Sequence, residues 1–223
     1  MQAKPEKKEI DDPRPTVFIV DDDQAVRDSL KWLISSVGLN VETYASAQEF
    51  KESCDPERAG CILMDVRMPG TSGLELQREM RERPICPPVI IVTGHGDVQM
   101  AVRAMKDGAF DFIEKPFNDQ VLLDLVQKAV DQSMKMVNEY KHQREILDKL
   151  DKLTPREREV LGLIVSGETN KGIAHILTIS DKTVEAHRAK VMEKIEANSF
   201  ADLMKKVMVL ESYQLDSGQK EAD

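Results

Sequence analysis

The chain has 223 residues, of which 41% are hydrophobic, and a formal net charge of -9 at pH 7. This length fits one large domain or two modest ones, and the acidic balance argues against a protein that coats nucleic acid regardless of sequence. No apolar run reaches the roughly 18 residues of a membrane-spanning helix, and the first residues lack the apolar core of a secretory signal. The three cysteines, Cys54, Cys61 and Cys86, have no metal-like spacing. We therefore expect a cytoplasmic protein with reduced thiols and no membrane partner.

Short apolar runs alternate with amphipathic stretches from Thr16 to about Gln132. The apolar runs predict buried strands at Val17–Val20, Val41–Tyr44, Cys61–Met64, Val89–Val92 and Phe110–Ile113. The stretches between them predict helices at Gln24–Val37, Ala47–Ser53, Gly73–Arg83, Val98–Asp107 and Asp119–Gln132. Capping residues support three of these helix starts, at Ser46, Ser72 and Asn118. The alternation indicates an α/β fold with a flavodoxin-like, doubly wound parallel sheet.

A charged stretch with a broken apolar stripe follows at residues 133–152. It predicts a helix that continues the preceding one as a connector, and both a dimeric coiled coil and a solvated linker helix remain open. The run Thr154–Glu157 then combines an N-cap, a first-turn proline and a capping box. Four short helices are predicted from here: one ending at Gly167, Asn170–Leu177, Asp181–Ile195 and one after Ser199.

These patterns divide the chain into five segments. They are a disordered lead-in (1–14), an α/β domain (15–132), the helical linker (133–152), an all-α domain (153–215) and a polar tail (216–223).

Polar residues follow four of the predicted strands at the point where each strand ends. Asp21, Asp22 and Asp23 follow the first strand, and Asp65 follows the third. Thr93 and Lys115 follow the fourth and fifth strands. The carboxyl ends of parallel strands form the rim where open α/β sheets bind charged ligands. Crowded carboxylates there favour Mg²⁺, and a carboxylate can attack phosphorus. Each signal alone also fits a solvated loop, a turn or a surface lysine, but together they predict phosphorylation of Asp65.

The motifs VDDD, LMDVRMPGTSGLEL, VTGHGD and DFIEKPF occur in order within Val17–Lys128. This stretch resembles a response-regulator receiver domain along its whole length. The resemblance implies that Asp22 and Asp65 ligate Mg²⁺ together with the backbone carbonyl of Arg67, and that Asp21 helps through water.

The same resemblance implies that Asp65 accepts a phosphoryl group from a sensor histidine kinase. Thr93 and Lys115 would hold that group, and Phe112 stands where the family has its switch aromatic. Family members commonly dimerise through the face made by the last two helices and the last strand of this domain. The resemblance therefore implies a homodimer formed on phosphorylation.

The segments LTPREREVL, NKGIAHIL and SDKTVEAHRAKVMEKI resemble the LuxR/NarL-type helix-turn-helix domain over Leu153–Val209. With a receiver in front, the whole chain resembles FixJ-type regulators. In the third helix the apolar residues Val184, Val191 and Ile195 share one face and should pack inward, which leaves the N-terminal half of the helix for the major groove of DNA. The predicted DNA contacts are Asn170, Lys171, Lys182, Thr183, Glu185, Ala186, Arg188, Ala189 and Lys190.

Within this set the side chains suggest separate tasks. Lys182 and Thr183 suit phosphates, Glu185 can accept from cytosine and Arg188 can reach guanine. His187 fits a structural role and a DNA-facing role equally well. The fourth helix fits both a contact between paired output domains and a plain core helix.

These expectations describe a phosphorylation-activated transcriptional regulator that binds paired half-sites in double-stranded promoter DNA, works with RNA polymerase and is not a turnover enzyme. Two alternatives remain open. One is a magnesium-dependent phosphatase with an aspartyl-phosphate intermediate at Asp21, although the acidic cluster stands first in the chain and no substrate-specificity insertion is visible. The other is an adaptor whose C-terminal helices bind protein.

Overall fold

The computed structural model describes residues 14–53, 58–83, 85–94 and 96–208. The chain divides into two compact units, residues 1–138 and 139–223, which are described separately below. The predicted lead-in up to residue 13, Cys54, and everything from residue 209 onward lie outside the described residues. Among the described helices none is long and apolar enough to cross a membrane.

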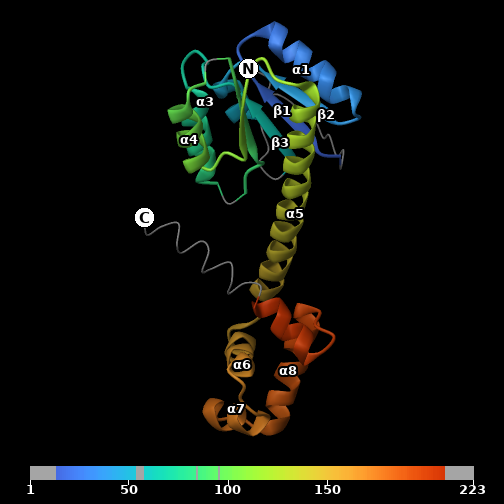
Figure 1. Cartoon of the computed structure of the whole chain (residues 1–223). Helices are drawn as coiled ribbons and strands as arrows, with labels where there is room; N and C mark the ends of the chain where they lie inside the picture. Colours follow the sequence, from blue (N-terminus) through green and yellow to red (C-terminus); the bar gives the residue numbers. More distant parts are fainter. Residues whose placement is uncertain (1–13, 54–57, 84, 95, 209–223) are drawn as a thin grey trace, which may run out of the picture. The chain divides into compact units, whose positions relative to one another are not determined.

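The first unit is built on a five-stranded parallel sheet with the order β2-β1-β3-β4-β5 (Figure 1). The strands are β1 (Thr16–Val20), β2 (Asn40–Tyr44), β3 (Gly60–Met64), β4 (Val89–Thr93) and β5 (Asp111–Glu114). The helices are α1 (Gln24–Ser36), α2 (Ala47–Ser53), α3 (Gly73–Arg81), α4 (Val98–Lys106) and α5 (Asp119–Asp151). This confirms the predicted doubly wound fold.

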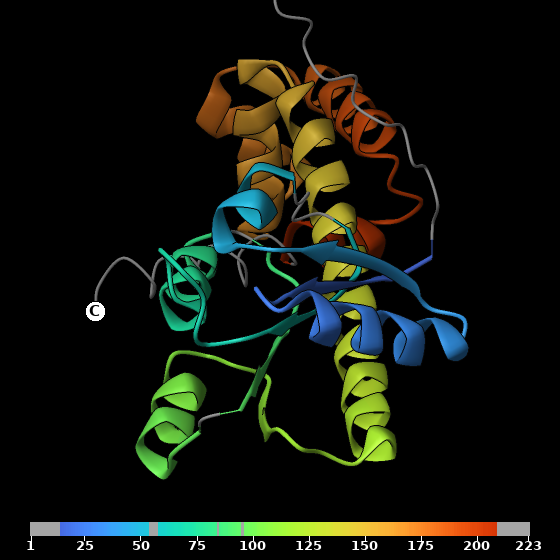
Figure 2. The same cartoon turned by 90° about the horizontal axis from the view of Figure 1, so that it is seen from above.

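The sheet is covered on both faces, which explains why its strands read as continuous apolar runs. Along β1, Phe18 and Val20 face a cluster that includes residues of α2, α3 and α4, while Val17 and Ile19 face a cluster built with α1 and α5. Figures 1 and 2 show α3 and α4 on one side of the sheet and α1 and α5 on the other. Each fully buried Leu, Ile or Phe side chain contributes about 1.5–3 kcal/mol, so the two clusters hold the strand ends in fixed register.

Several predicted bounds were wrong by one or two residues. The fifth strand is Asp111–Glu114 and not Phe110–Ile113, although the Phe110 amide still donates to the carbonyl of Val89. The third helix ends at Arg81, with Glu82 as its C-cap, and not at Arg83. Glycines with positive φ follow α1 and α4, at Gly38 and Gly108. The end of α3 is poorly marked because it is followed by charged residues and no glycine.

Helix α5 does not end at Gln132 but continues to Asp151, as expected for a helical linker. In addition to its apolar packing, α5 is joined to the start of β3 by a hydrogen bond of 3.0 Å from the Gly60 amide to the buried hydroxyl of Ser133. The units divide after Asn138, inside this helix. The exact domain boundaries at 132 and 152 stay predictions.

The second unit contains the predicted short helices. They are α6 (Pro155–Val165), α7 (Asn170–Leu177), α8 (Asp181–Ile195) and a last helix that extends from 200 to at least 208, where the described residues end. Val160, Ile173, Val184 and Val191 are fully buried between them. Three amphipathic helices thus share one small core, and the predicted inward face of α8 is confirmed.

The turn between α7 and α8 contains a strained residue. Thr178 has φ +54° and ψ +49°, in the left-handed region, although it is β-branched and exposed. Its amide donates to the carbonyl of His175, and the Ile179 amide donates to that of Ala174. These bonds close the end of α7 and hold the turn, at a cost of about 1–2 kcal/mol for a non-glycine residue in this conformation.

We predict that Thr178→Gly stabilises the second unit by about 1 kcal/mol, because glycine adopts this conformation without the Cβ penalty. Amide hydrogen exchange in α7 and α8 measures the change. The matched control is Gly167→Ala: Gly167 also has positive φ (+84°) and open space around its Cα, so alanine should destabilise the unit by a similar amount. Slower exchange in both variants, or in neither, would contradict the assignment of strain.

Candidate phosphorylation site and DNA-binding helix

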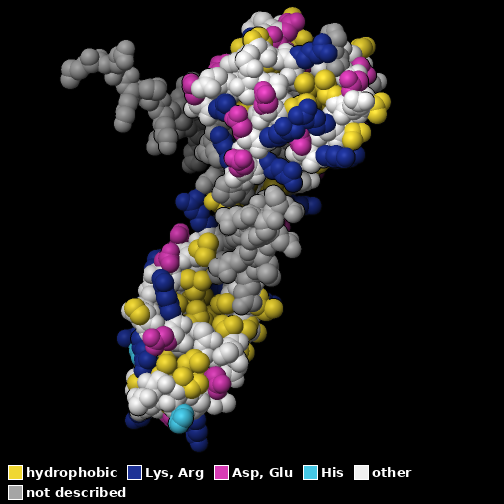
Figure 3. All heavy atoms as spheres, turned by 90° about the vertical axis from the view of Figure 1, so that its left-hand side faces the viewer, with side chains coloured by type: hydrophobic (Ala, Val, Ile, Leu, Met, Phe, Trp, Pro, Cys, Tyr) yellow, Lys and Arg dark blue, Asp and Glu magenta, His cyan; other side chains and the backbone are white. Residues whose placement is uncertain are grey.

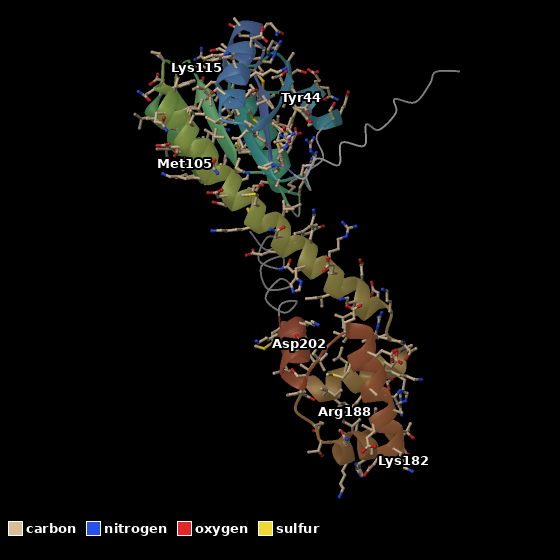
Figure 4. All side chains as sticks on the ribbon, turned by 90° about the vertical axis from the view of Figure 1, so that its right-hand side faces the viewer. Tyr44, Met105, Lys115, Lys182, Arg188 and Asp202 are labelled. Atoms are coloured by element: carbon tan, nitrogen blue, oxygen red, sulfur yellow. The ribbon has the colours of Figure 1, made fainter. Side chains whose placement is uncertain are left out.

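The carboxyl ends of β1, β3 and β5 bring three charged side chains together. The Lys115 ammonium lies 2.7 Å from Oδ2 of Asp21 and 3.4 Å from Oδ1 of Asp65. Both carboxylate residues are buried, with 3% and 8% of their surface exposed. Residues 94 and 50 positions apart in sequence thus share one charge cluster (Figure 4 labels Lys115).

Thr93 stands beside this cluster as the last residue of β4. It is 1% exposed, and its carbonyl accepts a hydrogen bond of 2.8 Å from the Lys115 amide. The backbone therefore ties the strand end that carries the threonine to the one that carries the lysine. The Lys115–Pro116 peptide bond is cis.

The environment of Asp65 opposes its ionisation. Burial is the main cause and raises the pKa of the carboxyl above its usual value of 3.8. The Lys115 charge and the Arg67 amide, which donates to Oδ2 at 2.6 Å, pull the pKa down, while the Asp21 charge raises it. The charge on Asp65 is therefore disfavoured by burial and favoured by Lys115 and the Arg67 amide. A bound cation or a covalent change at the carboxyl alters this balance.

The run of three acidic residues after β1 splits into three environments. Asp21 is buried in the rim, Asp22 is exposed, and Asp23 caps α1 by accepting from the amides of Ala25 and Val26. Of the predicted site residues, the structure joins Asp21 and Asp65 to Lys115 by direct contacts. The sequence analysis gave Asp22 and Asp21 different metal roles, but it missed that Asp23 caps α1.

The donor set fits Mg²⁺. Two buried carboxylates already share a single cation, the Lys115 ammonium, and Mg²⁺ needs only one or two carboxylates when waters fill its other positions. Within the described part of the chain, no cluster of three His, Cys, Asp or Glu side chains is close enough to hold a metal. The ligand roles of Asp22 and of the Arg67 carbonyl stay predictions.

Arg27 is a buried residue at this site that the sequence analysis missed. It is 8% exposed, donates from Nη1 to the main-chain carbonyl of Asp21 at 2.6 Å, and also contacts the side chain of Gln24. The guanidinium fixes the backbone at the start of the acidic run. Its signal was its spacing, because Arg27 shares the buried face of α1 with Leu30 and Ile34.

Helix α4 carries three exposed apolar residues on the predicted dimer face. Val98, Val102 and Met105 are 80%, 48% and 47% exposed. Figure 3 views the side of the first unit on which α3 and α4 lie, where hydrophobic, basic and acidic side chains share the surface. Isolated apolar side chains are ordinary on surfaces, but three on one short helix mark a face that favours contact with protein.

The predicted DNA-facing residues of α8 are displayed as expected for a recognition helix. Five of them are exposed and three are half-buried: the exposed ones are Lys182, Glu185, Ala186, Ala189 and Lys190, and the half-buried ones are Thr183, His187 and Arg188. Figure 4 labels Lys182 and Arg188 on this helix. Asn170 and Lys171 begin α7 behind the cap Thr169. Contact of these residues with DNA stays a prediction.

The C-terminal end of α8 is held by an ion pair between residues that are distant in sequence. Lys194 donates to Oε2 of Glu157 at 2.6 Å and to the carbonyl of Lys152 at 3.1 Å. The same Glu157 oxygen accepts from the Thr154 amide at 2.8 Å and completes the predicted capping box. Hydrogen bonding to Lys194, followed by that to Thr154, lowers the pKa of Glu157 from 4.5 to about 2.

Two family models match the sequence. One is the response regulator receiver domain, over residues 17–127, and the other is the luxR family of bacterial regulatory proteins, over residues 151–207. The chain belongs to the response regulators that join a receiver to a LuxR-type DNA-binding domain. This membership favours the receiver over a phosphatase and a DNA reader over a protein adaptor.

Similar proteins match this chain along most of their length. The transcriptional regulatory protein TdiR of Thauera aromatica is 43% identical over 92% of this chain and 90% of its own length. The regulatory protein FixJ of Bradyrhizobium diazoefficiens is 41% identical over 86% of this chain and 94% of its own. Among solved structures, the response regulator StyR is 41% identical with a TM-score of 0.79. The match covers 87% of this chain and 98% of the StyR chain.

We predict that Glu157→Gln destabilises the second unit at neutral pH, since it removes the charge that Lys194 meets. The folded-state pKa is depressed, so the stabilisation is present above pH 4.5 and is lost as pH falls from there to about 2. Hydrogen exchange of α6 and α8 amides against pH measures it. The variant and the wild type should converge at the acidic end.

Glu159→Gln is the matched control for this change. Glu159 lies in the same helix and pairs with Arg156 at 2.7 Å, but more than half of its side chain is exposed. Exposed pairs contribute little, so exchange should barely change. An equal effect of both variants would refute the special role of Glu157.

Proposed function

We propose that this response regulator is a transcriptional regulator switched by phosphorylation of Asp65. A sensor histidine kinase donates the phosphoryl group, and the phosphorylated chain binds paired promoter half-sites as a homodimer and acts on RNA polymerase. The observation that carries the proposal is the shared placement of Asp21, Asp65 and Lys115 in a chain that also has a LuxR-type helix with exposed Lys182 and Lys190. Its location would be the cytoplasm.

The transfer step makes an acyl phosphate. An Asp65 carboxylate oxygen attacks the phosphorus of a phosphohistidine, an O–P bond forms, and the P–N bond to the kinase imidazole breaks. Asp22, Asp65 and the Arg67 carbonyl, with Asp21 through water, would hold Mg²⁺, which neutralises charge on the phosphoryl oxygens. The Lys115 ammonium, 3.4 Å from Asp65, is near enough to pair with the new anion.

Phosphorylation changes the charge of the rim. The phosphoryl group carries about −1.5 to −2 charges and three acceptor oxygens where the free carboxylate carried a single negative charge, beside a lysine that already balances two carboxylates. The Thr93 hydroxyl is then drawn toward the phosphoryl oxygens, and Phe112 turns inward behind it. Moving this equilibrium from mostly off to mostly on requires about 5.5 kcal/mol of differential interaction, which a few charge-assisted bonds in a buried site can supply.

Dimerisation links this rim to DNA affinity. The exposed apolar residues of α4 lie on the face that would repack and pair. One recognition helix with few basic residues binds weakly, whereas two linked copies on paired half-sites gain from the second contact being intramolecular. The receiver thus controls the reader through the number of copies held together.

The test compares the wild type with Asp65→Asn in DNA-binding titrations on sequences selected from a genomic pool, with and without a small-molecule phosphodonor. The wild type should bind at least about tenfold more tightly with the donor, which corresponds to about 1.4 kcal/mol. Asp65→Asn should not respond, because an amide cannot form the acyl phosphate.

The control is Asp28→Asn on α1, an isosteric change at an exposed aspartate whose Oδ1 accepts a hydrogen bond from the side chain of Gln24. It should respond like the wild type. A response of Asp65→Asn equal to that of the control would refute the proposal.

A further inference from the structure

Gly96, in the loop between β4 and α4, lies directly against the ring of Phe112. A Cβ added to this glycine would lie 2.8 Å from Cζ and 3.0 Å from Cε1 of the ring. The same Cβ would lie 3.5 Å from the methyl carbon of Thr93. The missing side chain therefore leaves the space that the outer edge of the ring occupies, next to Thr93.

The surroundings of the two loop glycines differ. A Cβ added to Gly96 would meet the Phe112 ring, whereas one added to Gly94 would have nothing within 4 Å. The contact with Phe112 is thus the feature that separates Gly96 from Gly94.

The backbone of Phe112 is held in the sheet, whereas its ring lies at the edge of the core. Phe112 is paired with Ile91 across β4 and β5, and its amide donates to Asp111 Oδ1 at 2.7 Å. The side chain is half-buried at the edge of the core on the α3 and α4 side. Since the clash would fall on the far end of the ring, a methyl group at residue 96 would displace the ring rather than unfold the strand.

Few residues of helix α4 are buried against the rest of the unit. Ala104 is its only buried residue in the described structure, and the Ala104 carbonyl accepts from the buried amide of Gln77 at 3.0 Å. Asp107, the C-cap, pairs with Arg78 of α3 at 2.8 Å. In the N-terminal turn Val98 is 80% exposed, while the half-buried Met100 packs against the same core cluster as Phe112. The loop at Gly96 therefore leads from the Phe112 ring into a turn of α4 that is only partly buried.

We propose that Gly96 is a positioning residue of the switch: it provides the seat of the Phe112 ring in the unphosphorylated chain. Filling that seat displaces the ring and shifts the loop and α4 toward the arrangement that phosphorylation favours. The inference rests on the proposed function, in which Phe112 and Thr93 couple Asp65 to the dimer face. It adds a residue that neither binds the phosphoryl group nor moves as the switch.

The experiment uses the full chain with Gly96→Ala, the matched control Gly94→Ala, and each of these changes combined with Phe112→Leu. Two quantities are measured without phosphodonor: the NMR shift of the Thr93 methyl group, which senses the nearby ring, and the dimerisation constant from sedimentation. Gly96→Ala should move the methyl shift toward that of the phosphorylated wild type and raise dimerisation about tenfold. Gly94→Ala should leave both unchanged.

The double variants decide whether the ring carries the effect. In the Phe112→Leu background, Gly96→Ala should have no effect, because the added methyl group meets no ring. The inference is overturned if Gly96→Ala matches Gly94→Ala, if it lowers dimerisation, or if its effect survives in that background.

Failure of the proposed function has a different signature. In that case the phosphodonor leaves the methyl shift and dimerisation of the wild type unchanged, whereas Gly96→Ala still moves the methyl shift relative to Gly94→Ala. A loss of both signals identifies a failure of both proposals.

Discussion

The sharing of one ammonium group by two buried carboxylates is the constraint on which the first unit depends. Asp21 and Asp65 end neighbouring strands, and without Lys115 at 2.7 and 3.4 Å their charges would face each other across a poorly hydrated rim. Burial already raises the pKa of Asp65. With two carboxylates and one ammonium group, the site can accept a further positive charge. A phosphoryl group on Asp65 would compete with Asp21 for the same lysine.

The surroundings of this rim suit a switch better than a rigid binding site. Arg27 fixes the backbone of Asp21 from inside α1, and the β4 and β5 strand ends are joined by the bond from Lys115 to Thr93. The elements outside this rim are less buried. Ala104 is the one buried residue of α4 in the described structure, and the half-buried Phe112 ring lies against Gly96. A rigid inner shell that carries the charge and a looser outer shell that carries the response are what coupling between sites requires.

Much of this arrangement was predictable from sequence, because the carboxyl ends of parallel strands must meet at one edge. Asp21, Asp65, Thr93 and Lys115 follow from that rule alone. Arg27 and Gly96 did not, since their roles depend on tertiary contacts: one on a buried face of a helix, the other on a ring sixteen residues away in sequence. The pair of Glu157 with Lys194 was half predicted, as a capping box without its cation.

The central claim is that phosphorylation at Asp65 controls DNA affinity by pairing two chains. The most direct measurement is DNA affinity as a function of the fraction of chains phosphorylated, set by mixing phosphorylated chains with Asp65→Asn chains at constant total concentration. Pairing predicts that the fraction of DNA bound, measured well below saturation, rises with the square of the phosphorylated fraction, because both members of a pair must carry the group. A linear rise, or binding that ignores the phosphorylated fraction, would contradict it.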